Sequence, residues 1–384
     1  MSPKGGVGLS GDEAALYDRQ IRLWGLDAQN RLKNASVLLV GAGGVGAEVA
    51  KNLTLAGLKS LTILDDTILT EQDLQANFLA AKEDVGKNRA AASLARCQEL
   101  NPNVAMSAVE NLKIHEITSE FLHQFDLICA ADQGDQKLLE DLNAKCREAG
   151  KSFAAGGAFG LYAYAFFDFG SRHEFSEEVQ HQAKAAGSQQ KPTEIATSAA
   201  SAVVDLDASA SDDEETEILE DSGCTPPLPK VARRESAEQA RKIEEGKHPP
   251  ETTVKKESMS FVPLSEALSV DWGQKSLAGK ARRLLPQVYF IVRTLLKSSA
   301  DKYEETLQEL IKSHKLSADS FELKAADFQS QTKGQFGPSC AVCGGVVGQE
   351  IIKALSQKDR PLYNFFTFDP RHMRGAVSPL PPLK

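Results

Sequence analysis

Three glycines spaced as Gly41-x-Gly43-x-x-Gly46 are the clearest chemical signal in this chain of 384 residues. They follow an apolar run at 37–40 that is typical of a buried parallel strand, and they precede a helical stretch that Gly57 closes. Glycines in such a loop let unpaired N–H groups at a helix N-terminus approach a phosphate. The loop predicts a nucleotide-binding ancestry, although glycines that serve only close helix-to-strand packing give the same pattern.

An acidic residue stands where a nucleotide site needs one. Asp65 follows a second predicted strand at 61–64 and lies 19 residues after Gly46. A carboxylate in that position can accept hydrogen bonds from ribose hydroxyls. From the loop and Asp65 alone, the default expectation is an oxidoreductase that uses a nicotinamide or flavin nucleotide.

Strands and helices alternate through the first half of the chain. Ser10 and Glu13 have capping-box spacing, which predicts an amphipathic helix ahead of the first strand. Beyond Asp65, strands are predicted at 104–109, 127–130 and 152–155, and helices near 87–100 and 135–148. This alternation predicts an α/β fold with a Rossmann-like doubly wound sheet.

The middle of the chain has the composition of an unpacked segment. No aromatic residue occurs between Phe175 and Phe261, and residues 205–221 hold nine carboxylates with no Lys or Arg. We therefore expect 176–260 to be a disordered acidic and basic insertion between two halves of one domain, 1–175 and 261–384. The second half is predicted to contain helices at 277–296, 302–314 and 340–355 and a strand at 364–369.

Composition excludes several functional classes. The net charge is −9, from 44 basic and 53 acidic residues, which disfavours sequence-independent binding to nucleic acid. No uncharged stretch is longer than the 16 residues of 152–167, which are too few to cross a membrane. Six cysteines in so long a chain, without a charged and then apolar N-terminal leader, predict a reducing intracellular compartment.

The segment Tyr17-Asp-Arg-Gln-Ile-Arg-Leu-Trp-Gly25 resembles the opening of the adenylation domains of ubiquitin-like-protein activating enzymes and of their bacterial relatives MoeB and ThiF. The resemblance continues through the glycine loop and the segments 51–57, 64–66 and 85–86. In the second half, the segments 261–272, 340–355 and 364–369 are similar to the smaller subunits of the heterodimers that activate SUMO. The resemblance therefore implies a ThiF/MoeB-type activating-enzyme fold with a long insertion.

The resemblance also implies a function. In this family, one adenylation domain uses ATP and Mg²⁺ to form an acyl adenylate at the C-terminus of a ubiquitin-like protein, and a cysteine then takes the acyl group as a thioester. In the heterodimers, the larger subunit holds both the working nucleotide site and that cysteine. The chain is thus expected to be inactive alone and to have the larger subunit and SUMO as partners. The alternatives are the regulatory subunit of the NEDD8-type enzyme and a self-sufficient homodimeric MoeB/ThiF-like enzyme.

Residue by residue, the chain's own site departs from the active pattern of the family. The phosphate-facing Arg of active copies corresponds to Ala76, and their Lys corresponds to Arg89, whose planar guanidinium does not replace a compact ammonium. Asp132 matches the family's magnesium-binding Asp. The resemblance therefore implies an eroded, unoccupied cofactor site whose remaining residues are Gly41, Gly43, Gly46, Asp65 and Asp132.

Arg19, in the Tyr-x-Arg pattern, is the residue through which the resemblance implies a direct role in catalysis. In this family that Arg crosses the dimer interface and meets the γ-phosphate of the ATP that the partner binds. An arginine supplied in trans neutralises charge on the triphosphate and makes ATP binding depend on assembly.

The cysteines invite two other interpretations. Cys340-x-x-Cys343 has half the spacing of a zinc site, but the chain has no second pair, so core packing on a helix is the better account and no metal site is expected. Cys224 precedes Thr225 as the thioester cysteine of the family does. It lies in the aromatic-free insertion, where nothing would lower its pKa or shield a thioester, so no catalytic role is expected.

The insertion carries three short motifs of its own. Val203, Val204 and Leu206, followed by acidic residues, resemble a SUMO-interacting motif, although an ordinary acidic linker has the same composition. Lys255 fits the pattern of a SUMO acceptor site. The basic cluster at 230–234 favours nuclear import and a nuclear as well as cytoplasmic location, with a solvated charge cluster as the alternative.

Overall fold

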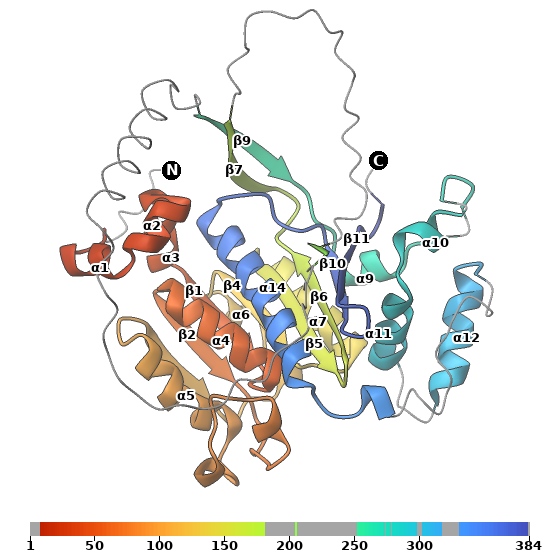
Figure 1. The fold of residues 1–384 in the computed structure, drawn as a ribbon, viewed down its shortest axis with the longest axis horizontal. Coiled ribbons are helices and arrows are strands. Elements are labelled where there is room, and N and C mark those ends of the chain that lie inside the picture. Colours follow the sequence, from red (N-terminus) through yellow and green to blue (C-terminus); the bar gives the residue numbers. More distant parts are fainter. Residues whose placement is uncertain are drawn as a thin grey trace, which may run out of the picture. The chain divides into compact units, whose positions relative to one another are not determined.

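The structure is a computed structural model that describes residues 8–180, 204–205, 252–272, 274–277, 279–297, 302–316 and 330–382. Met1–Glu177, Ala196–Asp205 and Lys256–Lys384 form one compact unit, and Glu178–Ile195 with Leu206–Lys255 form a second. Almost all described residues belong to the first unit, which is shown in Figure 1.

A nine-stranded sheet in the order β3-β2-β1-β4-β5-β6-β10-β11-β8 forms the centre of the first unit. Its first five strands pair in parallel. They are β1 (Ser36–Val40), β2 (Ser60–Leu64), β3 (Ala105–Val109), β4 (Leu127–Ala131) and β5 (Ser152–Phe159). These strands and the helices between them confirm the predicted doubly wound pattern. Each parallel pair needs a crossover connection that brings the chain back to the end of the sheet where the first strand began.

The other strands of this sheet pair antiparallel, so the sheet is mixed. They are β6 (Tyr162–Asp168), β10 (Phe365–Asp369), β11 (Arg374–Ser378) and the two-residue β8 (Val204–Asp205). The sequence did not separate β6 from β5 because both strands are buried on both faces and so form one apolar run without alternation. The only signal is Gly160, which has a φ of 55° in the turn between them.

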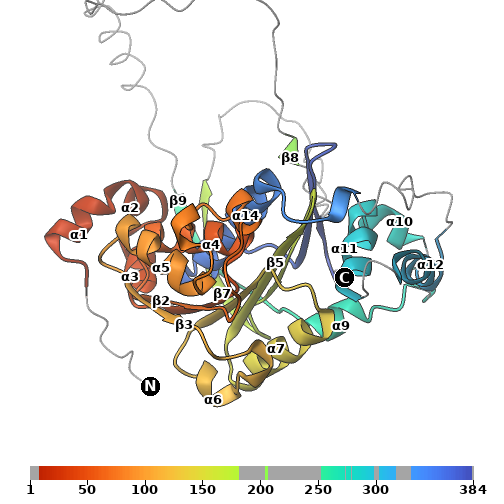
Figure 2. The ribbon, with the colours of Figure 1, turned by 90° about the horizontal axis from the view of Figure 1, so that it is seen from below.

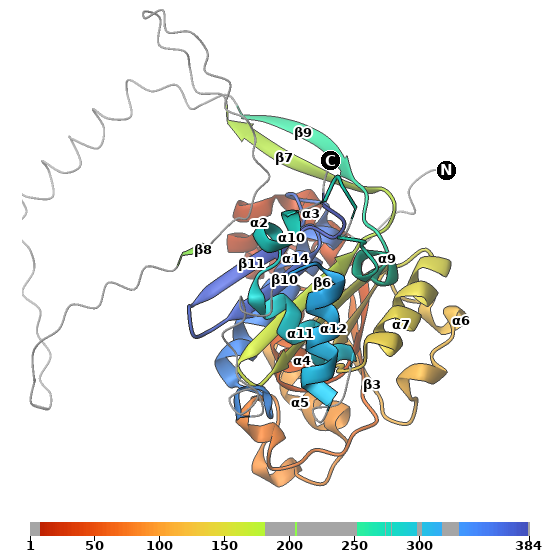
Figure 3. The ribbon, with the colours of Figure 1, turned by 90° about the vertical axis from the view of Figure 1, so that its right-hand side faces the viewer.

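Alternate residues of the central strands point to opposite faces of the sheet and build two cores. Val37 and Leu39 of β1 face one core, and Leu38 and Val40 face the other. Figure 2 shows α4 (Gly44–Ala56), α5 (Arg89–Leu100) and α14 (Gly337–Ser356) on one face and α6 (Ser119–Leu122), α7 (Gln136–Glu148) and α9 (Leu264–Leu268) on the other. The second face is extended by α10 (Lys280–Leu284), α11 (Gln287–Lys297) and α12 (Tyr303–Ser313), with α11 beside β6 and β10 (Figure 3).

Two helical predictions need correction. The single helix expected at 277–296 is two helices, α10 and α11, because Pro286 lies between them and cannot donate a backbone hydrogen bond to a continuous helix. The single N-terminal helix is three short ones, α1 (Gly11–Leu16), α2 (Asp18–Trp24) and α3 (Leu26–Lys33). The capping box of Ser10 and Glu13 that opens the first of them is confirmed.

The helix α14 joins the two halves of the domain by packing against α4. A side chain at Gly344 would collide with Glu48, and one at Gly348 would come within 2.9 Å of the Asn52 Cβ. These two glycines therefore allow close contact between the helix that follows the glycine loop and a helix about 300 residues later in the sequence.

The described ends of the predicted insertion are strands. β7 (His173–Gln180) and β9 (Thr252–Met259) form a separate two-stranded sheet, seen in Figures 1 and 3. The ordered chain thus extends into both ends of the range 176–260, and the prediction of disorder for 181–203 and 206–251 falls outside the described residues. Among the residues that are described, no helix is long and apolar enough to cross a membrane.

Candidate functional site

The glycine loop connects β1 to α4, and packing alone requires two of its glycines. Gly41 has a φ of 99°, and a Cβ there would collide with the carbonyl oxygen of Ala131. A Cβ at Gly46 would collide with the carbonyl oxygen of Gly41. The conformation therefore has to be kept whether or not a phosphate is bound, which is the packing alternative that the sequence left open.

The backbone donors at the start of α4 are already used by the protein itself. A helix leaves its first N–H groups unpaired, and these are the groups that bind phosphate in a glycine loop. Here the Gly44 N–H donates to Gln335 Oε1 at 2.8 Å, and the Val45 and Gly46 N–H groups donate to the Asp132 carboxylate at 3.3 and 2.8 Å. Side chains of the chain thus occupy the place of an anion.

Asp132 and Gln335 also bind each other. Gln335 Nε2 donates to Asp132 Oδ1 at 2.6 Å, so one amide bridges the glycine loop and the carboxylate. Asp132 follows β4 with a φ of 59°, a left-handed conformation that an aspartate tolerates. Burial raises the pKa of Asp132 above its usual range, although hydrogen bonds from Gly46, Gln335 and Val45 and the nearby Arg89 charge oppose the shift.

Asp65, the predicted ribose ligand, is likewise occupied from within the chain. It is 4% exposed, and its Oδ2 accepts from the Ala42 N–H at 2.7 Å and from Arg89 Nε at 2.8 Å. Arg89 also donates to Asp73 Oδ1 at 3.1 Å. Burial opposes charge on Arg89, but Asp65 and Asp73 outweigh it and raise the pKa of the guanidinium.

Asp73 completes this buried charge cluster from the loop after β2. Burial by itself raises the pKa of Asp73, but hydrogen bonds from Thr70 and the charge of Arg89 outweigh it and leave the pKa below its usual range. Arg89 therefore serves as the counter-ion of two carboxylates, and among the described residues it makes no hydrogen bond with the glycine loop. The sequence comparison with active copies identified Arg89 as altered, but it gave no sign of this ion pair.

The residues after Asp73 place a methyl group and an amide beside the loop. A Cβ at Gly44 would come within 2.7 Å of the Ala76 Cβ. Ala76 therefore lies beside the start of α4, and its methyl group brings no positive charge there. Asn77 is fully buried and donates to the Ala42 carbonyl oxygen at 2.8 Å. The loop is thus held from this side by a neutral hydrogen bond.

These residues do not fit ATP with Mg²⁺. The loop donors are paired with Asp132 and Gln335, Ala76 brings no charge to the start of α4, and the Asp65 carboxylate is paired with Arg89. The predicted set of Gly41, Gly43, Gly46, Asp65 and Asp132 is brought together at one place, but it is closed upon itself.

The structure does not bring Arg19 to that set. Arg19 is exposed on α2, and within the described part of the chain it makes no hydrogen bond or ion pair. The helix α2 contacts the C-terminal end of α4, where Gln20 Nε2 donates to the Leu55 carbonyl oxygen at 2.9 Å. The glycine loop lies at the other end of α4, and a helix of 13 residues separates its ends by about 20 Å.

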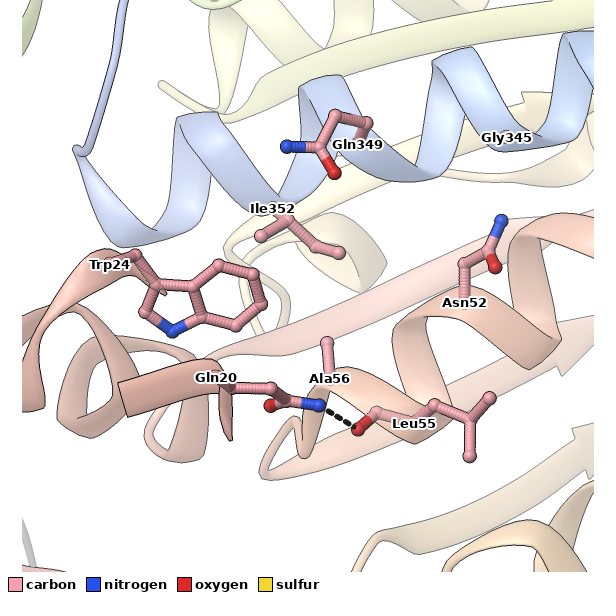
Figure 4. A pocket seen from close by; sticks show the side chains of 8 residues that line it. All are labelled: Gln20, Trp24, Asn52, Leu55, Ala56, Gly345, Gln349 and Ile352. Atoms are coloured by element: carbon pink, nitrogen blue, oxygen red, sulfur yellow. Dashed lines mark hydrogen bonds between the residues drawn. The ribbon is translucent and has the colours of Figure 1, made fainter. Parts of the chain in front are cut away.

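A groove runs between α2, α4 and α14 (Figure 4). Its volume is about 210 Å³, and Trp24, Asn52 and Ile352 are among the residues that line it. Gly345 also lines it, and a Cβ at this glycine would meet nothing within 4 Å, so the packing of the chain itself does not require a glycine there. Leu23, at 74% exposed, lies next to Trp24 on the same short helix.

Cys340 and Cys343 are both buried on α14, as the core-packing interpretation predicts. Burial raises the pKa of the Cys340 thiol to about 12. Cys343 Sγ donates to the Tyr164 carbonyl oxygen at 3.0 Å. Both are inert core thiols, and Cys224 lies outside the described residues.

The motif residues of the insertion are only partly described. Val204 and Asp205 form β8, which pairs antiparallel with Gly375 and Arg374 of β11. Lys255 is exposed on β9. Val203, Leu206 and the basic cluster at 230–234 lie outside the described residues, so the proposed SUMO-interacting, acceptor and import roles stay predictions.

Comparison with known proteins places this arrangement in a family. The profile of the ThiF family matches residues 17–383. SUMO-activating enzyme subunit 1 of Xenopus tropicalis is 37% identical over 381 residues, which cover 96% of each chain. The human SUMO-activating enzyme subunit 1 is 36% identical over 389 residues, which cover 98% of each chain.

A solved structure agrees in fold at low sequence identity. The crystal structure of PaaA matches with a TM-score of 0.50 and 14% identity, over 99% of this chain and 77% of the other. This likeness bears on the fold alone, and the family assignment rests on the matched profile and the relatives above 30% identity. The chain therefore belongs to the ThiF family, within which it is similar over nearly its whole length to SUMO-activating enzyme subunit 1.

Proposed function

We propose that the chain is the non-thioester subunit of a heterodimeric SUMO-activating enzyme. In this proposal, it supports ATP-dependent adenylation of the SUMO C-terminus, which takes place on a larger partner subunit that also carries the thioester cysteine. Relatives of the same length, named SUMO-activating enzyme subunit 1, support the choice of SUMO over a NEDD8-type modifier. The observation that carries the proposal is the glycine loop closed by Asp132 and Gln335.

The closed loop is the reason to assign ATP and Mg²⁺ to the partner. A triphosphate that entered this chain's loop would meet the Asp132 carboxylate, and it would find no cation at Ala76 to offset the repulsion. Adenylation depends on several placed charges that act together, so losing them removes the activity and not only some affinity. The same argument counts against a self-sufficient homodimeric enzyme of the MoeB or ThiF type.

Arg19 is the residue that we assign to the reaction. Its side chain is exposed, its helix packs on the end of α4 that lies opposite the chain's own loop, about 20 Å along the helix, and no described residue binds it, so it is free to reach another molecule. A partner's ATP would supply the phosphate oxygens that a guanidinium binds in a bidentate manner. The partner would then bind ATP productively only when this subunit is in place.

We assign the assembled enzyme to the nucleus, with a cytoplasmic fraction, because of the basic cluster at 230–234. Replacing Lys230, Arg233 and Arg234 by alanine should move a fluorescent fusion of the chain from the nucleus to the cytoplasm. An unchanged distribution would remove the cluster from the proposal.

The decisive experiment is ATP–pyrophosphate exchange that depends on mature SUMO. It is run with the purified chain alone, with the larger SUMO-activating subunit alone, and with both. We expect no exchange from the chain alone and full exchange from the mixture. Exchange by the chain alone would mean that the loop opens and binds ATP, and the proposal would then be wrong.

A further inference from the structure

The C-terminal end of α4 is an attachment point for the N-terminal helices. A helix leaves its last carbonyl groups without partners inside the helix. Here three successive carbonyl oxygens each accept a side-chain amide N–H: Thr54 from Asn101 at 2.9 Å, Leu55 from Gln20 at 2.9 Å, and Ala56 from Gln29 at 2.8 Å. Three amides from three different elements therefore complete the end of α4.

Tyr17 fixes the start of α2 at the same place. Its ring lies against Gly57, where a Cβ would come within 2.5 Å of the Tyr17 Cζ, and Gly57 has a φ of 79°. Asn101 Nδ2 donates to the Tyr17 hydroxyl at 2.8 Å as well as to Thr54. Tyr17 is only 4% exposed although neither α1 nor α2 buries a residue of its own.

Trp24 fixes the other end of α2. Its Nε1 donates to Gln29 Oε1 at 2.9 Å, and Gln29, on α3, is fully buried. Figure 4 shows the side chain of Trp24 beside Gln20, whose bond to Leu55 holds the middle of the helix. A helix of seven residues is not stable in water by itself, so these contacts decide where α2 lies.

The anchored helix leaves one arginine free of any internal partner. Arg19 stands between Tyr17 and Gln20, and within the described residues it has neither an ion pair nor a hydrogen bond. Arg22 on the same helix instead pairs with Asp18 at 2.9 Å. The backbone that carries Arg19 is thus placed in advance, and only its side chain has to order when it meets a ligand.

We propose that Tyr17, Asn101 and Gln29 are positioning residues for Arg19. They hold α2 on the end of α4 at the angle from which the guanidinium of Arg19 enters the active site of the partner subunit. This inference rests on the proposed function. It adds that the contribution of Arg19 depends on a buried hydrogen-bond network that itself makes no contact with ATP.

The test is a double-mutant cycle in the assembled heterodimer. Tyr17→Phe removes only the hydroxyl that accepts from Asn101, and Gln29→Met keeps the length of the side chain but removes both hydrogen bonds. Each variant is made with Arg19 intact and with Arg19→Ala, and kcat/KM for ATP is measured by SUMO-dependent pyrophosphate exchange at saturating partner subunit. Arg22→Ala is the control, because it removes an exposed charge from the same helix.

With Arg19 intact, each positioning variant should lower kcat/KM for ATP by about threefold to tenfold, the effect of one or two hydrogen bonds. In the Arg19→Ala background the same variants should cause no further loss, and Arg22→Ala should be neutral in both. Tyr17→Phe removes a single oxygen atom, so the test holds even if Gln29→Met fails to fold.

Equal losses in both backgrounds would overturn the inference, because they would mean that the network acts through folding or assembly. Full activity of both positioning variants with Arg19 intact would also overturn it, and would leave the role of Arg19 standing. An Arg19→Ala complex with unchanged kcat/KM for ATP would overturn the inference together with the trans role of Arg19 in the proposed function.

Discussion

Replacing Arg89 distinguishes most sharply between two roles for this residue, binding a nucleotide and forming a structural ion pair. The Arg89 side chain is 15% exposed. It binds Asp65, whose side chain is 3% exposed, at 2.8 Å and Asp73 at 3.1 Å. Arg89→Ala would leave the Asp65 carboxylate buried without a counter-ion. Breaking a buried pair in this way costs about 3–5 kcal/mol of the free energy of unfolding.

The expected change in melting temperature follows from this free energy. A large domain loses about 2 °C for each kcal/mol, so Arg89→Ala should lower the melting temperature by about 6–10 °C. Arg89→Lys should lose about half as much, because an ammonium can pair with one carboxylate but cannot bridge two. Lys87→Ala is the matched control, since its side chain is 61% exposed and its pair with Asp84 should change the melting temperature by less than about 1 °C.

The assay is thermal unfolding of the purified chain, followed by circular dichroism with and without ATP and Mg²⁺. Nucleotide should leave the melting temperature of each protein, wild type or variant, unchanged, because a ligand raises stability only if it binds the folded state. A wild-type chain that ATP stabilises, together with an Arg89→Ala variant that melts normally but no longer responds to ATP, would refute the reasoning. Arg89 would then be a ligand of a working site.

Four further predictions concern other parts of the chain. Gln335→Ala should speed amide hydrogen exchange at the start of α4, because one backbone donor loses its acceptor; unchanged exchange in a mass-spectrometric measurement would show that the amide does not close the loop. The pKa of Asp73 is lowered in the folded state, so its ion pair stabilises the chain above the unfolded pKa near 4 and is lost as pH falls below it. The difference in melting temperature between wild type and Arg89→Ala should therefore shrink as the pH falls from about 4 through the lower pKa of Asp73 in the folded state, and a constant difference would contradict this assignment. Lys255→Arg should abolish a SUMO-modified band of the chain in a conjugation reaction, and persistence of the band would place the modification elsewhere. A peptide of residues 199–220 should shift the resonances of SUMO on titration, whereas an unresponsive spectrum would identify the segment as an acidic linker.

Local sequence signals predicted the parallel half of the sheet well. The strands at 36–40 and 60–64 are short apolar runs, the helix between them ends at Gly57, and the helix after the second strand begins at the capping residue Asn88. Each of these signals depends on neighbours within a few residues, so the sequence alone carries them. The capping box at Ser10 is another case of this kind.

The sequence patterns failed to predict elements that are buried on both faces and a helix that a proline interrupts. β6 was not predicted, and only the first half of β5 was, because the residues of both strands are apolar on both faces of the sheet and show no alternation. The prediction of one helix at 277–296 was wrong. Its apolar residues continue across Pro286, but a proline has no backbone N–H and ends the first helix there. The small strand β11 carries no apolar run from which to predict it.

The sequence by itself determined the family and the glycine loop, and its resemblance to active copies predicted the loss of an arginine at Ala76 and of a lysine at Arg89. Only the tertiary structure decided what replaced the ligand, because the groups that close the site come from distant parts of the chain. Gln335 lies 291 residues from Gly44, to which it is hydrogen bonded. The structure likewise decided where Arg19 lies, because three side-chain amides from separate elements meet at the end of α4, and no sequence spacing encodes such a meeting.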